Sequence, residues 1–132
     1  MKIIDKLAWI EIQNKKILST RSKGRDTFYI PGGKRESGES DTEALLREIR
    51  EELSVDLNEN SLQHIGNFEA QAHGHAEGIL VKMTCYTADF SGILKIDSEI
   101  EEMAWLTTED MYRISPVDKI IFNFLFEKGM ID

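Results

Sequence analysis

Cysteine, proline and long apolar runs are scarce in this sequence, and each scarcity excludes a class of protein. The 132 residues include one cysteine, Cys85, so no disulfide can form within the chain, and we expect a reduced, cytoplasmic protein. With two prolines and no serine- or glycine-rich stretch, no linker divides the chain, and residues 1–132 are predicted to form one domain. The apolar run at residues 7–10 is too short for a signal peptide, and no segment approaches the roughly 20 residues of a membrane span.

Positive charge is also in short supply. Lysine and arginine number 16 against 24 aspartates and glutamates, which gives a net charge of −8. The field of such a protein repels nucleic-acid polymers and anionic membranes, so neither is expected as a partner. A small polyphosphate remains compatible with this charge if local positive charge, such as a metal ion, outweighs the global sign.

The apolar pattern indicates a mixed α/β protein with helices packed on a sheet. Strands are expected at residues 7–12, 16–20, 27–30, 61–70 and 78–89, the first three as a meander, with a loop at 71–77. A first helix is expected from Ser40, where Glu43 completes a capping box, to Leu53. A second helix is expected between an N-cap at Ser115 and a stop at Gly129.

The first helix separates its apolar and acidic residues onto different faces. One apolar stripe contains Leu45, Leu46, Ile49 and Leu53. Glu51 and Glu52 lie within about 60° on either side of Glu48, so three carboxylates share one narrow face. Glu48 and Glu52 also form a repulsive i,i+4 pair. Such a face is either simply solvated or binds Mg²⁺ or Mn²⁺, which prefer oxygen ligands.

The segment Pro31-Gly32-Gly33 precedes this helix and allows a sharp turn toward its acidic face. Gly33 and Gly38 bracket four residues, as in a P-loop, but Glu39 stands where that motif needs a lysine for the phosphates. We therefore expect metal ions, rather than a lysine, to mediate contact with phosphate at this turn.

From Gly33 to Val55 the chain resembles the Nudix box, G-x5-E-x7-R-E-U-x-E-E-x-G-U, in which U is apolar. The match includes Glu39 and the run that begins at Arg47. One fixed position differs, because Ser54 stands where the family has the glycine that supplies a left-handed helix cap. The chain length and the later acidic segment that ends in Trp105 are also similar, so the resemblance covers most of the chain.

This resemblance implies the Nudix fold, a mixed β-sheet sandwiched between α-helices, and divalent-metal-dependent hydrolysis. The substrate would be a nucleoside diphosphate derivative, such as a normal, oxidised or noncanonical nucleoside triphosphate. Its products would be a nucleoside monophosphate and the remaining phosphorylated group. A noncatalytic Nudix-like sensor of nucleotide or ADP-ribose is the alternative, and the retained carboxylates favour the enzyme.

The resemblance also assigns roles to individual residues. Glu51 and Glu52 would be the principal ligands of Mg²⁺ or Mn²⁺. The Gly32 carbonyl and Glu48 would complete the set, and Glu48 is alternatively the base that deprotonates water. Glu99, six residues before a tryptophan, is a further candidate for ligand or catalytic base.

Two supporting residues belong to the same set. Arg47 and Glu39 would act through arginine–carboxylate hydrogen bonds that direct the other carboxylates. For Arg47, a surface ion pair with Glu43 or Glu51 is the other interpretation. For the acidic run around Glu99, the alternatives are a solvated turn and a role for Glu101 or Glu102 instead.

Three further groups carry weaker signals. The basic cluster Arg21, Lys23 and Arg25 is a candidate contact for substrate phosphates. His73 and His75 have a spacing seen in zinc sites but lack a matching further ligand, so a substrate contact or a flexible loop is favoured. Phe28 and Tyr29 are expected to divide between core and pocket, and Phe122 and Phe126 suggest core packing or a homodimer contact.

Overall fold

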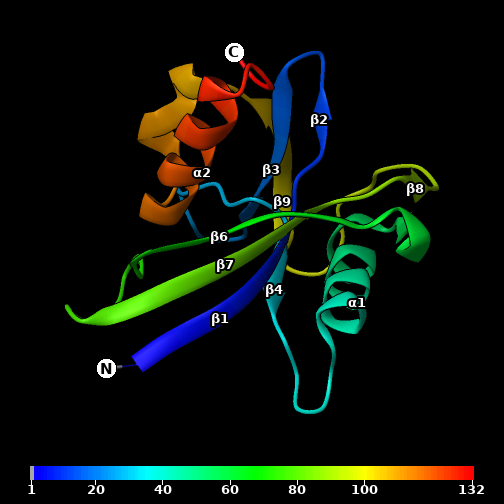
Figure 1. The fold of residues 1–132 in the computed structure, drawn as a ribbon, viewed down its shortest axis with the longest axis horizontal. Coiled ribbons are helices and arrows are strands. Elements are labelled where there is room, and N and C mark those ends of the chain that lie inside the picture. The colour runs from blue at the N-terminus through cyan, green and yellow to red at the C-terminus, as the bar shows by residue number, and fades with distance from the viewer. Residues whose placement is uncertain (1) are drawn as a thin grey trace.

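A four-stranded sheet lies between the two helices of this computed structural model, which describes residues 2–132 (Figure 1). The elements in chain order are β1 (Lys2–Trp9), β2 (Ile12–Gln13), β3 (Lys16–Ser22), β4 (Gly32–Lys34), α1 (Asp41–Leu53), β5 (Asp56–Leu57), η1 (Glu59–Ser61), β6 (Gln63–Gln71), β7 (Ile79–Thr87), β8 (Phe90–Ser91), β9 (Ile100–Leu106), η2 (Thr108–Arg113) and α2 (Pro116–Glu127). The strand order of the main sheet is β4-β1-β7-β6, and a second sheet has the order β2-β3-β9.

The strand β1 divides the core into two layers by simple alternation. Leu7 and Trp9 are buried with the apolar stripe of α1. Ala8 and Ile10 face the other way and are buried with α2 residues such as Phe122. Side chains of a strand alternate between the two faces of a sheet, so a central strand buried on both faces requires a helix on each side. The expected mixed sheet between helices is confirmed.

The expected meander is confirmed only in part, because β2 and β3 pair as antiparallel neighbours but β1 belongs to the other sheet. β1 pairs in parallel with β7 and antiparallel with β4, whereas β3 pairs with β2 and β9. Residues 27–30 form only two isolated bridges, Thr20 to Tyr29 and Phe28 to Ile114. The apolar alternation indicated which residues are buried, but it carries no information on which distant strand completes the hydrogen bonds.

Both helices begin where the sequence predicts. The Ser40 hydroxyl accepts from the Glu43 N–H, and the Glu43 carboxylate accepts from the Ser40 N–H, so the capping box is complete. Ser115 caps α2, and Pro116 occupies its first turn. The α1 helix ends at Ser54 in the left-handed conformation, with φ 62° and ψ 23°.

Several other expectations are settled by burial. Phe28 is buried and Tyr29 lines a cavity, as expected. Phe122 belongs to the core, whereas Phe126 is 52% exposed on α2. Cys85 is a free, buried thiol on β7, and burial raises its pKa to about 12. Within residues 2–132, no helix has both the length and the apolar character needed to cross a membrane.

Candidate active site

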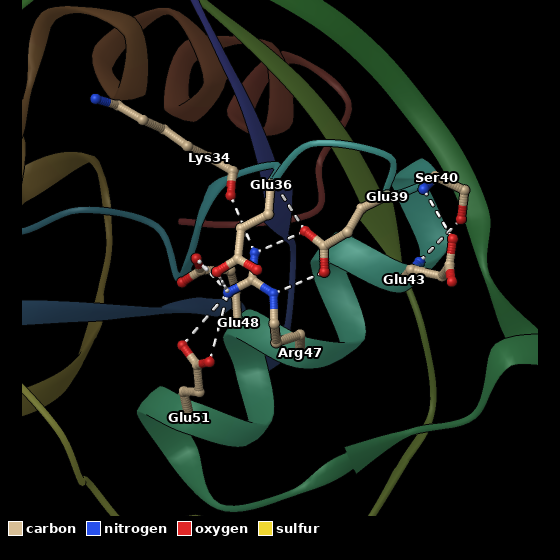
Figure 2. Close-up of polar contacts among 8 residues, drawn as sticks. All are labelled: Lys34, Glu36, Glu39, Ser40, Glu43, Arg47, Glu48 and Glu51. Atoms are coloured by element: carbon tan, nitrogen blue, oxygen red, sulfur yellow. Dashed lines mark hydrogen bonds and ion pairs between the residues drawn. The ribbon is translucent and has the colours of Figure 1, made fainter.

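Arg47 is the centre of a carboxylate network on one face of α1 (Figure 2). Its Nε and Nη2 donate to the two oxygens of Glu39 at 2.7 and 2.8 Å, and its Nη1 donates to Glu48 at 3.0 Å. Nη2 also donates to the Lys34 carbonyl at 3.2 Å. The hydrogen bonds from Arg47 lower the pKa of Glu39 to about 2. The guanidinium therefore ties the β4–α1 connection to the helix and directs Glu48.

Both interpretations of Arg47 apply in part, since it directs carboxylates of the site and also forms an i,i+4 ion pair on α1. It pairs with Glu51, where Nη1 lies 3.4 Å from Oε2, as well as with Glu39 and Glu48. The expected alternative partner Glu43 is instead engaged in the capping box.

Glu52 and Glu48 meet beside Gly32 and Gly33, which form the start of strand β4 and not the sharp turn expected from the sequence. The Gly32 N–H donates to Glu52 Oε1 at 3.4 Å. A Cβ on Gly33 would lie 2.5 Å from the Glu48 carboxyl carbon, so only glycine lets this carboxylate approach the backbone. Burial and then the nearby Glu48 charge raise the pKa of Glu52 to about 8, and burial also raises the pKa of Glu48. Two acids are thus held where neither ionises freely.

Glu51 is placed differently from these two carboxylates. Its side chain is 50% exposed and lies against Arg47, one turn earlier on α1. Across residues 2–132, no three aspartate, glutamate, histidine or cysteine side chains form a ready-made metal cage. Glu48 and Glu52 therefore lie together, whereas Glu51, the third carboxylate of this face, pairs with Arg47.

A cavity of about 700 Å³ opens beside Glu52 and the two glycines of β4, and Glu99 also lines it. The segment before β9 reaches this place because its backbone caps α1. The Lys95 and Asp97 N–H groups donate to the Leu53 and Glu52 carbonyls, each at 3.0 Å. This docking satisfies carbonyls that a helix end leaves unpaired and carries Glu99 to the cavity. Glu99 itself lies in an exposed turn just before β9, as the solvated-turn alternative predicts, and the acidic run beyond it belongs to strand β9.

The cavity is lined by more cationic than anionic side chains, although the chain as a whole is acidic. The cations are Lys6, Lys23, Arg25 and Lys34, and the acids are Glu52, Glu99 and Asp118. Arg21 is not among the lining residues, because it pairs with Glu101 and Glu102 on β9 at 3.0 and 3.1 Å. The basic cluster of the sequence is therefore divided between an ion-pair network and the cavity wall.

His73 and His75 line the outer part of the same cavity, in the connection between β6 and β7. His73 Nδ1 lies 2.8 Å from the Tyr29 hydroxyl, so this histidine has a hydrogen-bond partner across the cavity. No zinc-like ligand group surrounds the pair within the described residues.

Sequence reasoning missed Lys6 and Asp118, which the fold places in the cavity wall. Asp118 is 1% exposed, and its Oδ2 accepts from the Ile30 N–H at 2.8 Å. Its Oδ1 has no hydrogen-bond partner among residues 2–132, and burial raises the pKa of the carboxyl to about 7. An aspartate in the first turn of a helix is ordinary, so no sequence pattern indicates that Asp118 faces inward. For Lys6, the signal was its place on β1 between the apolar residues Ile4 and Ala8.

Comparison with known proteins identifies the family of this chain. The family model described as the NUDIX domain matches residues 7–126. The CTP pyrophosphohydrolase of Escherichia coli K12 is 29% identical over 125 residues, which cover 89% of this chain and 87% of that protein. The uncharacterized Nudix hydrolase YvcI of Bacillus subtilis is 26% identical over 114 residues, or 85% and 72% of the two chains.

Solved structures of bacterial proteins share this fold. The E. coli ORF135 protein superposes with a TM-score of 0.75 at 25% identity and covers 96% of this chain and 91% of its own. The MutT NUDIX hydrolase of Burkholderia pseudomallei gives a TM-score of 0.77 at 21% identity, over 93% and 98% of the two chains. The two glycines of β4, the arginine-centred carboxylates and a family match that spans most of the chain together establish that this protein belongs to the Nudix hydrolase family.

Proposed function

We propose that this Nudix pyrophosphohydrolase cleaves the diphosphate linkage of a nucleoside triphosphate, normal or modified, and releases a nucleoside monophosphate and pyrophosphate. The observation that carries the proposal is the pair of half-buried carboxylates, Glu48 and Glu52, of which Glu52 lines a cavity with more cationic than anionic side chains. A noncatalytic nucleotide sensor would gain nothing from two neighbouring acids, one of which raises the pKa of the other. Their retention therefore supports the enzyme.

The chemistry of these carboxylates fits a divalent cation. Each of the two acids is destabilised in its ionised form by burial, and a positive ion between them would reverse that effect. The residues proposed to hold Mg²⁺ or Mn²⁺ are Glu48, Glu51, Glu52, Glu99 and the Gly32 carbonyl. Bound there, the metal would neutralise phosphate oxygens and lower the pKa of the attacking water.

The remaining residues of the network position these groups. Arg47 holds Glu48 and Glu39 through charge-assisted hydrogen bonds, which fix the direction of the carboxylates. Glu48 is proposed to take the proton from the attacking water, with Glu99, which lines the cavity, as the alternative base. Lys23 and Arg25 are proposed to contact the substrate phosphates.

The inner part of the cavity has the character of a base site. Ala72, Val81, Met83 and Val117 line it, and apolar walls with a few polar groups are typical of small-molecule pockets. The unpartnered Oδ1 of Asp118 is the polar acceptor there, and we propose that it binds an N–H group of the base. The relative named CTP pyrophosphohydrolase is consistent with a nucleoside triphosphate in this position.

The proposal is tested with a panel of nucleoside triphosphates, dinucleoside polyphosphates, nucleotide sugars and ADP-ribose, each assayed with Mg²⁺ and with Mn²⁺. We expect release of monophosphate and pyrophosphate from at least one nucleoside triphosphate and loss of that activity after exhaustive chelation. Binding of ADP-ribose or nucleotide without turnover would support the sensor instead. Undiminished turnover in the chelated protein would contradict the metal assignment.

A further inference from the structure

Lys6 lies between two buried apolar residues on one face of β1. Ile4 and Ala8, its neighbours on that face, are 8% and 0% exposed. The Lys6 side chain lines the cavity, and burial lowers its pKa despite the attraction of Asp118. A lysine is rarely kept in such a place without a partner, because removing the ammonium from water is costly.

In the part of the chain that the structure describes, the Lys6 ammonium makes a cation–π contact with the Tyr29 ring but meets no hydrogen-bond acceptor. It has no hydrogen bond and no ion pair within 4.0 Å there, and the Tyr29 ring centroid lies 5.6 Å from Nζ. Asp118 exerts the strongest charge effect on it, yet the Asp118 Oδ1 is also without a hydrogen-bond partner. Two opposite charges thus line one cavity without touching, and a ligand group placed between them would satisfy both.

The chemistry of the two groups specifies that ligand group. An ammonium offers only hydrogen-bond donors and an ionised carboxylate only acceptors, so the ligand must present an acceptor beside an N–H donor. A phosphate fits poorly, because it has no donor and Asp118 would repel it. The edge of a nucleobase fits, and the apolar side chains of Val81 and Met83 in the same cavity suit its ring.

We propose that Lys6 is a specificity-determining residue, which donates to an acceptor of the nucleobase while Asp118 accepts from the adjacent N–H of the same base. This inference rests on the proposed function. Guanine and uracil each present a carbonyl oxygen directly beside a ring N–H, which matches Lys6 and Asp118 together. Adenine and cytosine instead present a ring nitrogen beside their amino N–H, and that nitrogen has one lone pair where a carbonyl oxygen has two. We therefore expect GTP and UTP to be preferred over ATP and CTP.

The test compares nucleotides with ribose 5-triphosphate, which keeps the phosphates and lacks a base. The parent, Lys6→Met and Lys6→Arg are assayed on ATP, GTP, CTP, UTP and ribose 5-triphosphate under the same metal conditions. Lys2→Met is the matched control, because Lys2 lies on the same face of β1 but is exposed and outside the cavity wall. Unfolding temperatures of all four proteins are measured alongside to confirm that each is folded.

For Lys6→Met we expect kcat/KM on the preferred nucleotide to fall at least about tenfold, mostly through KM, because a hydrogen bond from a charged group is lost. In this variant the ratio of kcat/KM on the preferred nucleotide to kcat/KM on ATP should fall. The kcat/KM on ribose 5-triphosphate should stay within about twofold of the parent value. Lys6→Arg should keep part of the preference, and Lys2→Met should behave as the parent.

Other outcomes overturn the inference in distinct ways. An equal loss of kcat/KM on nucleotides and on ribose 5-triphosphate would show that Lys6 contacts the phosphates instead of the base. Unchanged kinetics in folded Lys6→Met would show that Lys6 does not contact the substrate. If the folded parent itself hydrolyses none of the nucleotides, the proposed function fails, and the inference fails with it. That failure is recognised from the parent alone, before any variant is compared.

Discussion

At the scale of single residues, Glu52 combines burial, a like-charged neighbour and a place at the cavity mouth. Glu52→Gln keeps the size of the side chain and removes its charge. We expect turnover to fall by at least about two orders of magnitude, the range seen when one electrostatic catalytic group is lost. The metal-free protein should melt at the same or a higher temperature, because one of two repelling acids is gone. Activity assays and melting curves with and without Mn²⁺ measure both effects.

The matched control for this change is Glu127→Gln, which removes the same charge from an exposed position on α2. It should leave turnover and metal-induced stabilisation as in the parent. The stabilisation by Mn²⁺ should shrink in Glu52→Gln, because a ligand that binds only the folded state stabilises it according to its saturation. A Glu52→Gln protein with parental turnover and parental stabilisation would show that Glu52 is only a structural helix residue.

Ser54 is the residue at which this chain departs from the Nudix box. Its φ of 62° lies in the left-handed region, where a side chain is strained and glycine is not. Ser54→Gly should therefore raise the free energy of unfolding by about 0.5 to 1 kcal/mol, with activity unchanged. Chemical denaturation measures the difference, and a clear loss of stability would show that the serine hydroxyl has a role of its own.

At the scale of elements, α1 is fixed at both ends, and its carboxylates depend on that fixing. The capping box holds its first turn, and backbone N–H groups of Lys95 and Asp97 cover its last carbonyls. The same contacts join the two walls of the site, because Glu52 lies on the helix and Glu99 follows the docked segment. The hydrogen bonds of Lys95 and Asp97 to the end of α1 thus determine how Glu99 lies relative to Glu52.

The N-cap offers a test of this arrangement. Ser40→Ala removes the hydroxyl that accepts from the Glu43 N–H and should cost about 1 kcal/mol of stability. Ser40→Gly should cost only a few tenths of a kcal/mol, because glycine is itself tolerated at an N-cap. Chemical denaturation of both variants measures the two costs. Equal losses in both variants would contradict the capping interpretation.

At the scale of the whole molecule, burial of Asp118 links stability to pH. Its pKa of about 7 in the folded protein lies above the value of about 3.9 expected in the unfolded chain. Between these values the folded protein binds more protons, so the stability associated with neutral Asp118 is present below about pH 4 and is lost as pH rises through 7.

Asp118→Asn imitates the neutral carboxyl at every pH and isolates this effect from other titrating groups. In chelated protein, we expect the variant to be more stable than the parent at about pH 8, with a difference that shrinks toward about pH 5. Unfolding temperatures at several pH values measure the difference. A difference that does not change with pH would show that Asp118 does not titrate in this range.

The sequence by itself determined the chemistry and the local structure. Residue types at fixed spacing identified the Nudix box, the capping box of α1 and the apolar stripe that buries one face of this helix. Ser54 was expected at the left-handed helix end, and the structure places it there. These features depend on residues within a few turns of one another, and the backbone geometry of a helix converts such spacing directly into position.

Tertiary structure alone decided what meets across the cavity. The parallel pairing of β1 with β7 joins segments more than seventy residues apart, and no local pattern specifies such a partner. That pairing turns the Lys6 face of β1 toward Asp118 on α2, and the ion pairs of Arg21 with β9 exclude this arginine from the cavity wall. Which charges are buried together, and which are neutralised elsewhere, depends on long-range packing, so the proposed base site is visible only in the folded chain.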